Sequence, residues 1–204
     1  LATGTQLWKI SLNGQIRGII FDTTDSVLYI GSGDGYAYKL SIGGEILGKT
    51  YVEAWPYRYS FVLSHDSQYI VSSSKIGKSC LVSTSNMETL WCFDVRGGGH
   101  WAAITSDNTY VFIGSGGSYP AMAFDLDGNM LWFHTKVSKS RLISEDGKYI
   151  MMDGDLYNLN GKLLWDNNLP GEPDFSYIFK DNSKIITFFK DDGILRIWTG
   201  YLEE

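Results

Sequence analysis

The chain has 204 residues, and its 17 basic and 23 acidic side chains give a formal net charge of −6. An acidic chain lacks the basic surface that nucleic-acid binding requires, so we expect no nucleic-acid partner. No apolar run approaches the length of about 18 residues that a membrane-spanning helix needs, so we expect no membrane span. Aromatic residues make up 15% of the chain, including seven Trp and thirteen Tyr, which suits extended β surfaces.

The first expected element is a short strand within residues 5–12, TQLWKISL. Residues 15–50 then read as one unit of four strands, separated by turns at Thr23-Thr24-Asp25, Asp34-Gly35 and Gly43-Gly44. Glycine and aspartate at such positions supply the positive φ angles that tight hairpins need. The four strands of this unit are expected at IRGIIFD, SVLYIGSG, GYAYKLS and EILGKTYV.

Four comparable units follow along the chain, at residues 56–95, 99–137, 138–169 and 173–204. The third unit of the chain reads HWAAIT, YVFIGSG, PAMAFDL and NMLWFHTKV, whereas the last unit supplies only DFSYIF, KIITFFK and GILRIWTG. Helical periodicity is absent throughout, which predicts an all-β fold.

Two independent markers recur with a period of about forty residues, which indicates a repeat protein. The first marker is an acidic turn before the second strand of each unit, aligned at Asp25, Asp66, Asp107, Asp146 and Asn182. The second marker is the dipeptide LW at the start of the fourth strand. It occurs at Leu7-Trp8, Leu90-Trp91, Leu131-Trp132 and Leu164-Trp165, and Leu47-Gly48 occupies the missing slot.

The second strand of each unit is almost continuously apolar, reading VLYI, YIV, YVFI, YIMM and IITFF. Such a run predicts burial on both faces of the sheet, whereas a two-sheet sandwich would show alternation. We therefore predict one β-propeller domain over residues 1–204, with five blades of four antiparallel strands. Residues 5–12 are expected to pair with the C-terminal blade and so close the ring. The alternative is a larger propeller with further blades upstream.

The stretch LYIGSGDGYAYKLSIGGEI and the repeated GxxLW pattern resemble pyrroloquinoline-quinone-type propeller repeats. The acidic turns and the terminal IWTG resemble WD-repeats. The chain departs from the WD pattern because its one GH dipeptide is Gly99-His100, and because Gly48 replaces a Trp. This resemblance implies the propeller fold. It does not select a function, because such propellers include quinoprotein dehydrogenases, assembly scaffolds and surface or signalling proteins.

Loops that join fourth to first strands and second to third strands should open on one face of a propeller, which we call the loop face. Trp, Tyr and Arg dominate protein interfaces and also stack on sugars, so a protein or glycan partner is expected there. The alternative is that some of these aromatic rings fill gaps between blades. The candidate residues are Trp55, Tyr57, Arg58, Arg96, His100, Trp101 and Tyr119.

The innermost strands should place Arg17, Arg58 and Asp174 at the mouth of the central channel. Two arginines in neighbouring blades could bind a carboxylate or a phosphate with paired hydrogen bonds. Alternatively, the arginines pair with Asp174 and line a wet channel.

The two cysteines, Cys80 and Cys92, flank a probable turn centred on Asn86, so they should face each other across paired strands. A disulfide and two buried thiols are both compatible with this spacing. Two cysteines do not fix the compartment. An extracytoplasmic or cell-surface location is slightly favoured.

No catalytic or metal-binding pattern stands out in the sequence. The three histidines are dispersed, no HxH, HExxH or CxxC spacing occurs, and one acidic residue per turn does not assemble a calcium site. We therefore expect a non-enzymatic binding or scaffold module without a cofactor. The alternatives are a quinoprotein-like or glycan-active enzyme, and a structural repeat of a cell-surface protein.

Overall fold

The computed structural model divides into two compact units, residues 1–102 and residues 103–204, and each is described by itself. Nineteen strands, and no helix, lie within the residues that the structure describes. The described residues are 4–54, 56–74, 77–95, 98–115, 121–134, 141–144, 146–152, 154–166, 173, 175–190 and 193–199.

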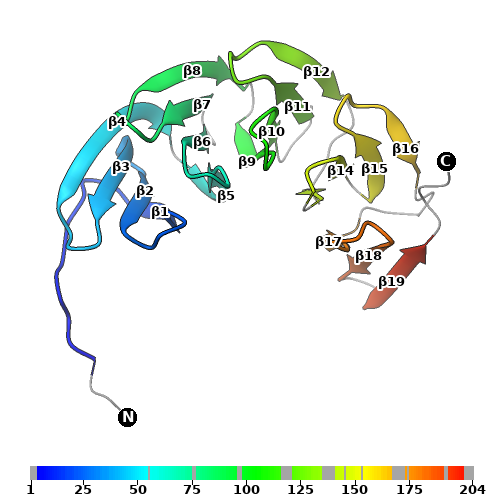
Figure 1. The fold of residues 1–204 in the computed structure, drawn as a ribbon, viewed down its shortest axis with the longest axis horizontal. Coiled ribbons are helices and arrows are strands. Elements are labelled where there is room, and N and C mark those ends of the chain that lie inside the picture. Colours follow the sequence, from blue (N-terminus) through cyan, green and yellow to red (C-terminus); the bar gives the residue numbers. More distant parts are fainter. Residues whose placement is uncertain are drawn as a thin grey trace. The chain divides into compact units, whose positions relative to one another are not determined.

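The first unit contains two four-stranded sheets, each of which follows the chain in the order of its strands (Figure 1). All neighbouring strands in them pair antiparallel. The first sheet consists of β1 (Ile16–Phe21), β2 (Val27–Ser32), β3 (Gly35–Ser41) and β4 (Ile46–Ala54). The second sheet consists of β5 (Pro56–Leu63), β6 (Tyr69–Ser74), β7 (Lys78–Ser83) and β8 (Thr89–Asp94).

Three more sheets follow, and the boundary between the two units falls inside the first strand of the third sheet. The third sheet consists of β9 (Gly99–Ile104), β10 (Val111–Ser115), β11 (Ala121–Phe124) and β12 (Met130–His134). The fourth consists of β13 (Arg141–Ile143), β14 (Tyr149–Met152), β15 (Asp155–Asn158) and β16 (Leu163–Trp165). The fifth consists of β17 (Phe175–Ile178), β18 (Lys184–Phe189) and β19 (Ile194–Thr199).

The second strands β2, β6 and β14 are buried on both faces, as their continuous apolar runs predict. The prediction is wrong for β18 of the fifth sheet, where buried residues alternate with more exposed ones. In the first unit the two sheets pack face to face. Tyr29 and Val52 of the first sheet share a core cluster with Phe61 and Ile70 of the second. In the second unit, Met151 of the fourth sheet packs in the same way with Ile185 of the fifth. Apolar burial between neighbouring sheets therefore stabilises both of these pairs.

The hairpin turns between first and second strands follow one side-chain hydrogen-bonding scheme in the second, third and fourth sheets. In the second sheet the Ser64 hydroxyl donates to Asp66 at 2.7 Å and accepts the backbone N–H of Tyr69 at 2.9 Å. The same scheme recurs at Thr105 and Asp107, and at Ser144 and Asp146. Side-chain bonds to the backbone of this kind fix a turn without requiring glycine.

The sequence alignment of these turns needs a correction of one residue at both ends of the chain. The residues with positive φ are Asp25, Ser67, Asn108, Gly147 and Asn182, so Asp25 and Asn182 are not equivalents of Asp66. In the first sheet the carboxylate and the hydroxyl exchange positions, so that Asp22 corresponds to Ser64 and Thr24 to Asp66. Asp22 accepts the N–H of Val27 at 3.0 Å, and the hydroxyl of Thr24 donates to Asp22 at 2.7 Å.

Two tryptophans of the GxxLW pattern, Trp8 and Trp132, pack on a turn of the sheet that follows them in the chain. Trp132 of the third sheet donates its indole N–H to the Leu159 carbonyl of the fourth at 2.6 Å, and a Cβ built on Gly161 would lie 2.9 Å from its ring. Trp8 makes the equivalent contact with the first sheet, through Ile42 at 2.8 Å and Gly44. Glycine is required at both turns because any side chain there would overlap the indole. We call this arrangement the tryptophan–turn contact.

The expected pairing of residues 5–12 with the last sheet would join the two units and stays a prediction. The fifth sheet has three strands within the described residues, and the described residues 4–15 contain no strand (Figure 1). Trp8, Ile10 and Leu12 pack against the core cluster of the first sheet that includes Ile30 and Leu40. Burial of these three side chains, together with the indole hydrogen bond, holds the segment without a backbone ladder.

Candidate functional site

The junction between the first two sheets is irregular at the loop face. β4 ends at Ala54 and β5 begins at Pro56, so Trp55, which lies outside the described residues, is the whole connection. The register of β3 and β4 slips between Gly35 and Tyr36. Glu53 has a φ of 47°, although it lies in no hairpin turn between paired strands. A bulge and a non-glycine residue in the left-handed region both cost free energy, and both are concentrated near functional sites.

The first strand of the second sheet is irregular as well. Its register jumps from Pro56 opposite Ser74 to Phe61 opposite Ser72, so β5 has more residues than β6 in this stretch. The backbones of Tyr57 and Arg58 lie in this excess segment, and their side chains fall outside the described residues. The loop predicted to bind a partner therefore interrupts the repeat in two adjoining strands.

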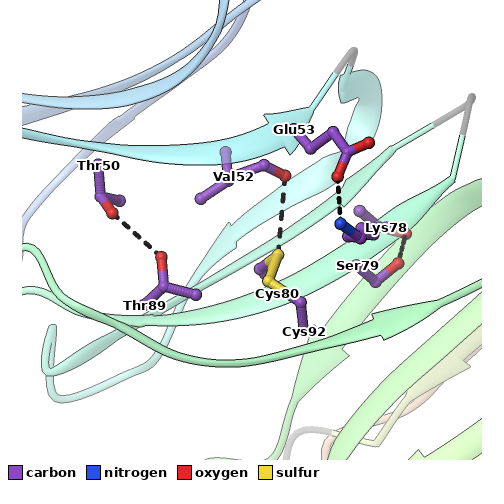
Figure 2. The surroundings of a disulfide bond; sticks show 9 residues. Thr50, Val52, Glu53, Lys78, Ser79, Cys80, Thr89 and Cys92 are labelled. Carbon is purple, nitrogen blue, oxygen red and sulfur yellow. Dashed lines mark hydrogen bonds and ion pairs between the residues drawn. A yellow bond between two sulfur atoms is a disulfide. The ribbon is translucent and has the colours of Figure 1, made fainter.

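An ion pair joins the two sheets beside this loop. Lys78 Nζ of β7 lies 2.5 Å from the Glu53 carboxylate of β4 (Figure 2). The hydrogen bond with Glu53, and then the charge of the same carboxylate, raises the pKa of Lys78. Because both groups are exposed to solvent, the pair fixes geometry more than it contributes stability.

A tyrosine cluster that the sequence analysis did not single out lies on the first sheet near the same face. Tyr36 pairs with Tyr51 across β3 and β4, and their rings meet edge to face with centroids 5.2 Å apart. Lys49 Nζ lies 4.7 Å from the centre of the Tyr36 ring, and Tyr51 is 57% exposed. The signal was present as alternating tyrosines in GYAY, but their partners depend on strand register.

Tyr38 belongs to this cluster and is buried. Its hydroxyl donates to Asp34 at 2.7 Å. Burial, and then the hydrogen bond to Asp34, raise the pKa of Tyr38 to about 12. The phenol is therefore a neutral hydrogen-bond donor at neutral pH, and it anchors the buried side of the cluster.

Of the predicted channel-mouth residues, Arg17 is described. Arg17 lies in β1, and its guanidinium donates to the Gln15 side chain at 2.7 Å. The Arg58 side chain and Asp174 lie outside the described residues, so the expected arginine pair stays a prediction.

The remaining loop-face candidates come from the third unit of the sequence. His100 and Trp101 both lie in β9. Trp101 is only 8% exposed, so it is largely buried in this structure. Its assignment to the binding surface and the alternative, that it fills a gap between blades, both stay predictions. Arg96 and Tyr119 lie outside the described residues.

Cys80 and Cys92 form a disulfide across a directly opposed pair of β7 and β8 residues (Figure 2). The Cα atoms of the two residues are 4.1 Å apart. Cys80 is completely buried, and Cys92 lies on the exposed side of the outer strand. Of the two arrangements left open by the sequence, the structure therefore contains the disulfide.

Within the described part of the chain, no three His, Cys, Asp or Glu side chains lie close enough together to hold a metal ion. The same residues include no helix that is long and apolar enough to cross a membrane.

No protein-family model matches the chain, and no curated protein matches its sequence. The chain is similar in fold to the β-propeller domain of Cps50 (Swd1) from Myceliophteria thermophila, with a TM-score of 0.70 and 10% sequence identity. The match covers 95% of this chain and 68% of that chain. An identity of 10% carries the fold and no activity. The likeness does not extend to the pyrroloquinoline-quinone-type repeat, which stays a prediction. Together with the antiparallel four-stranded sheets, it confirms that the chain has an all-β propeller fold.

Proposed function

We propose that this propeller is a non-enzymatic binding or scaffold module, and that its loop face contacts a protein or glycan partner. The segment around Tyr57 and Arg58 forms the centre of the proposed site, and the cluster of Tyr36, Lys49 and Tyr51 forms its described edge.

The irregular junction at Glu53 carries this proposal. The repeated residues of each unit are accounted for by turns and by contacts between sheets. The bulge at Glu53 and the excess residues of β5 serve neither purpose, and Glu53 of the bulge pairs with Lys78 of the second sheet. Local strain that the surrounding structure holds in place is typical of segments that present side chains to a ligand.

The test places a photocrosslinking amino acid at position 57 of the full chain, and at position 45 as a matched control. Glu45 is exposed in the β3–β4 turn, at the opposite end of the strands from the loop face. Crosslinks to one defined partner from position 57 and not from position 45 support the proposal. Equal crosslinking from both positions contradicts it.

Glycan binding is measured separately, on an array probed with the wild-type chain, Tyr57→Ala and Glu45→Ala. Tyr57→Ala should lose at least about tenfold in affinity for any glycan that the wild type binds, because stacking on an aromatic ring supplies much of such affinity. The Glu45→Ala variant should bind as the wild type does. A loss of glycan affinity in both variants would mean that the glycan does not bind specifically at Tyr57.

An enzyme that uses a quinone cofactor is the second candidate, because of the repeat resemblance described above. The discriminating measurement is the absorbance spectrum of the purified chain after pyrroloquinoline quinone and calcium are added and the excess is removed. A retained chromophore would favour the enzyme over the binding module.

A further inference from the structure

The contact between the first and second sheets lacks the tryptophan that the third sheet and the N-terminal segment use, Trp132 and Trp8. Gly48 occupies the tryptophan position of the first sheet, and Met87 occupies the glycine position of the following turn. A Cβ built on Gly48 would lie 3.0 Å from Cγ of Met87, so the methionine fills part of the space that an indole takes elsewhere. This junction therefore has a smaller apolar contact and no indole hydrogen bond.

Other interactions join β4 of the first sheet to the second sheet (Figure 2). Thr50 of β4 and Thr89 of β8 share a hydrogen bond of 3.0 Å. The backbone carbonyl of Val52 in β4 lies 3.7 Å from Sγ of Cys80 in β7. The contact between Thr50 and Thr89 therefore depends on the outer strand β8 staying paired with β7, and the disulfide links these two strands.

The disulfide joins one exposed residue to one buried residue. Cys92 lies on an exposed position of the outer strand, whereas Cys80 is completely buried against the first sheet. A disulfide sulfur carries no hydrogen, so its approach to the Val52 carbonyl is a contact and not a hydrogen bond. A reduced Cys80 could donate its S–H to this same oxygen. The buried side of the bond thus has an acceptor ready for the reduced state.

We propose that the Cys80–Cys92 disulfide makes the junction between the first and second sheets sensitive to the thiol redox state. When the bond is intact, β8 is held against β7 and the contacts to β4 persist. When the bond is reduced, β8 separates more readily from β7, and β4 loses part of its support. The proposal does not depend on the partner suggested above.

The reaction requires a dithiol reductant. One thiolate of the dithiol attacks Sγ of Cys92, the exposed residue of the pair, the S–S bond breaks, and Cys80 leaves as a thiolate that takes up a proton. The second thiol of the reductant then attacks the mixed disulfide, releases Cys92, and becomes oxidised to a disulfide. Two electrons pass from the dithiol to the protein, and a disulfide oxidant reverses the exchange.

The test is amide hydrogen exchange of the full chain, followed by mass spectrometry, with and without dithiothreitol. Reduction should speed exchange in β4 and β8 by roughly tenfold or more, and should leave β14 and β18 of the second unit unchanged. A thiol count on the native protein establishes that the bond has been reduced.

Two variants serve as controls. The pair Cys80→Ser and Cys92→Ser should exchange like the reduced protein and should not respond to dithiothreitol. The pair Gly48→Trp and Met87→Gly rebuilds the tryptophan–turn contact while keeping both cysteines, and should reduce the redox response of β4. If the serine pair fails to fold, the second pair still tests the proposal.

Three results would overturn the proposal. Resistance of the native disulfide to dithiothreitol would show that Cys92 is not open to attack. Unchanged exchange after reduction would show that the bond does not support the junction. An equal loss of protection in both units would make the disulfide a support of the whole chain rather than of one junction.

Discussion

Gly48 and Met87 together exchange the roles that tryptophan and glycine hold in the other turns. Met87 has a φ of 58°, in the same left-handed region as Gly44, Gly128 and Gly161 at the equivalent turns. A large side chain on the turn thus replaces a large side chain on the neighbouring strand. The space between the two sheets is filled in both cases, because packed interiors leave little unoccupied volume.

This exchange predicts strong coupling between the two positions. Gly48→Trp alone should destabilise the chain by about 1–3 kcal/mol, because the indole would overlap Met87. Met87→Gly alone should cost about 1–4 kcal/mol, since it empties a buried site but relieves the positive φ. The double variant should lose about 1–3 kcal/mol less free energy of unfolding than the sum of the losses in the two single variants, as measured by urea unfolding. Additive losses of stability would contradict the conclusion that Gly48 and Met87 exchange the roles of tryptophan and glycine.

A second prediction concerns the close approach of Gly161 and Trp132. Gly161→Ala should cost about 2–3 kcal/mol, because the new methyl group would overlap the indole and the φ of 77° is unfavourable for alanine. Gly193→Ala is the matched control. Gly193 also has a positive φ, of 63°, but nothing lies within 4 Å of an added Cβ, so only about 1 kcal/mol should be lost. If thermal unfolding shows equal losses of stability in the two variants, then overlap with the Trp132 indole is not what destabilises Gly161→Ala.

The N-terminal segment offers a comparison between neighbouring residues. Trp8→Ala should destabilise the first unit by about 1–3 kcal/mol, because Trp8 packs on the first sheet and donates to Ile42. Leu7→Ala should change stability by less than about 0.5 kcal/mol, because Leu7 is 88% exposed. Hydrogen exchange of β2 and β3 locates the effect. Similar losses of stability in both variants would mean that the Trp8 indole is not what attaches the segment to the first sheet.

Acid should weaken the turns through their aspartates. Hydrogen bonds, from the Thr105 side chain first and then from Thr109, hold the pKa of Asp107 below its usual value of 3.8. A lowered pKa in the folded state contributes stability above about pH 4, and this contribution is lost as the pH falls through the folded-state pKa. The effect should stay below about 1 kcal/mol, because solvent screens this exposed group.

Asp107→Asn tests this sign. The variant should lose little stability at pH 7, and its free energy of unfolding should fall less steeply than that of the wild type between about pH 4 and pH 2. Urea unfolding at a series of pH values measures both slopes. Parallel slopes would show that the hydrogen bonds of Asp107 do not favour its charged form.

The repeated pattern made the strands predictable. The turns were harder to predict because residues exchange positions in them, and the side-chain environments because they depend on distant contacts. The apolar second strands and the LW dipeptides placed the units within a few residues of the sheets that form. The turn alignment failed at Asp25, because Asp22 and Thr24 trade the roles held by Ser64 and Asp66. Side-chain environments depend on contacts between distant segments, so the burial of Trp101 could not be read from its loop-like surroundings.

The exchange of Asp22 and Thr24 has a consequence for how this repeat varies. A carboxylate and a hydroxyl complete the turn in either order, so the residue type at each position can change as long as the two positions stay complementary. A comparison that scores one column at a time would register two mismatches where the geometry has not changed. Relatives of this chain should therefore be recognised more readily by complementary pairs of positions than by single invariant residues.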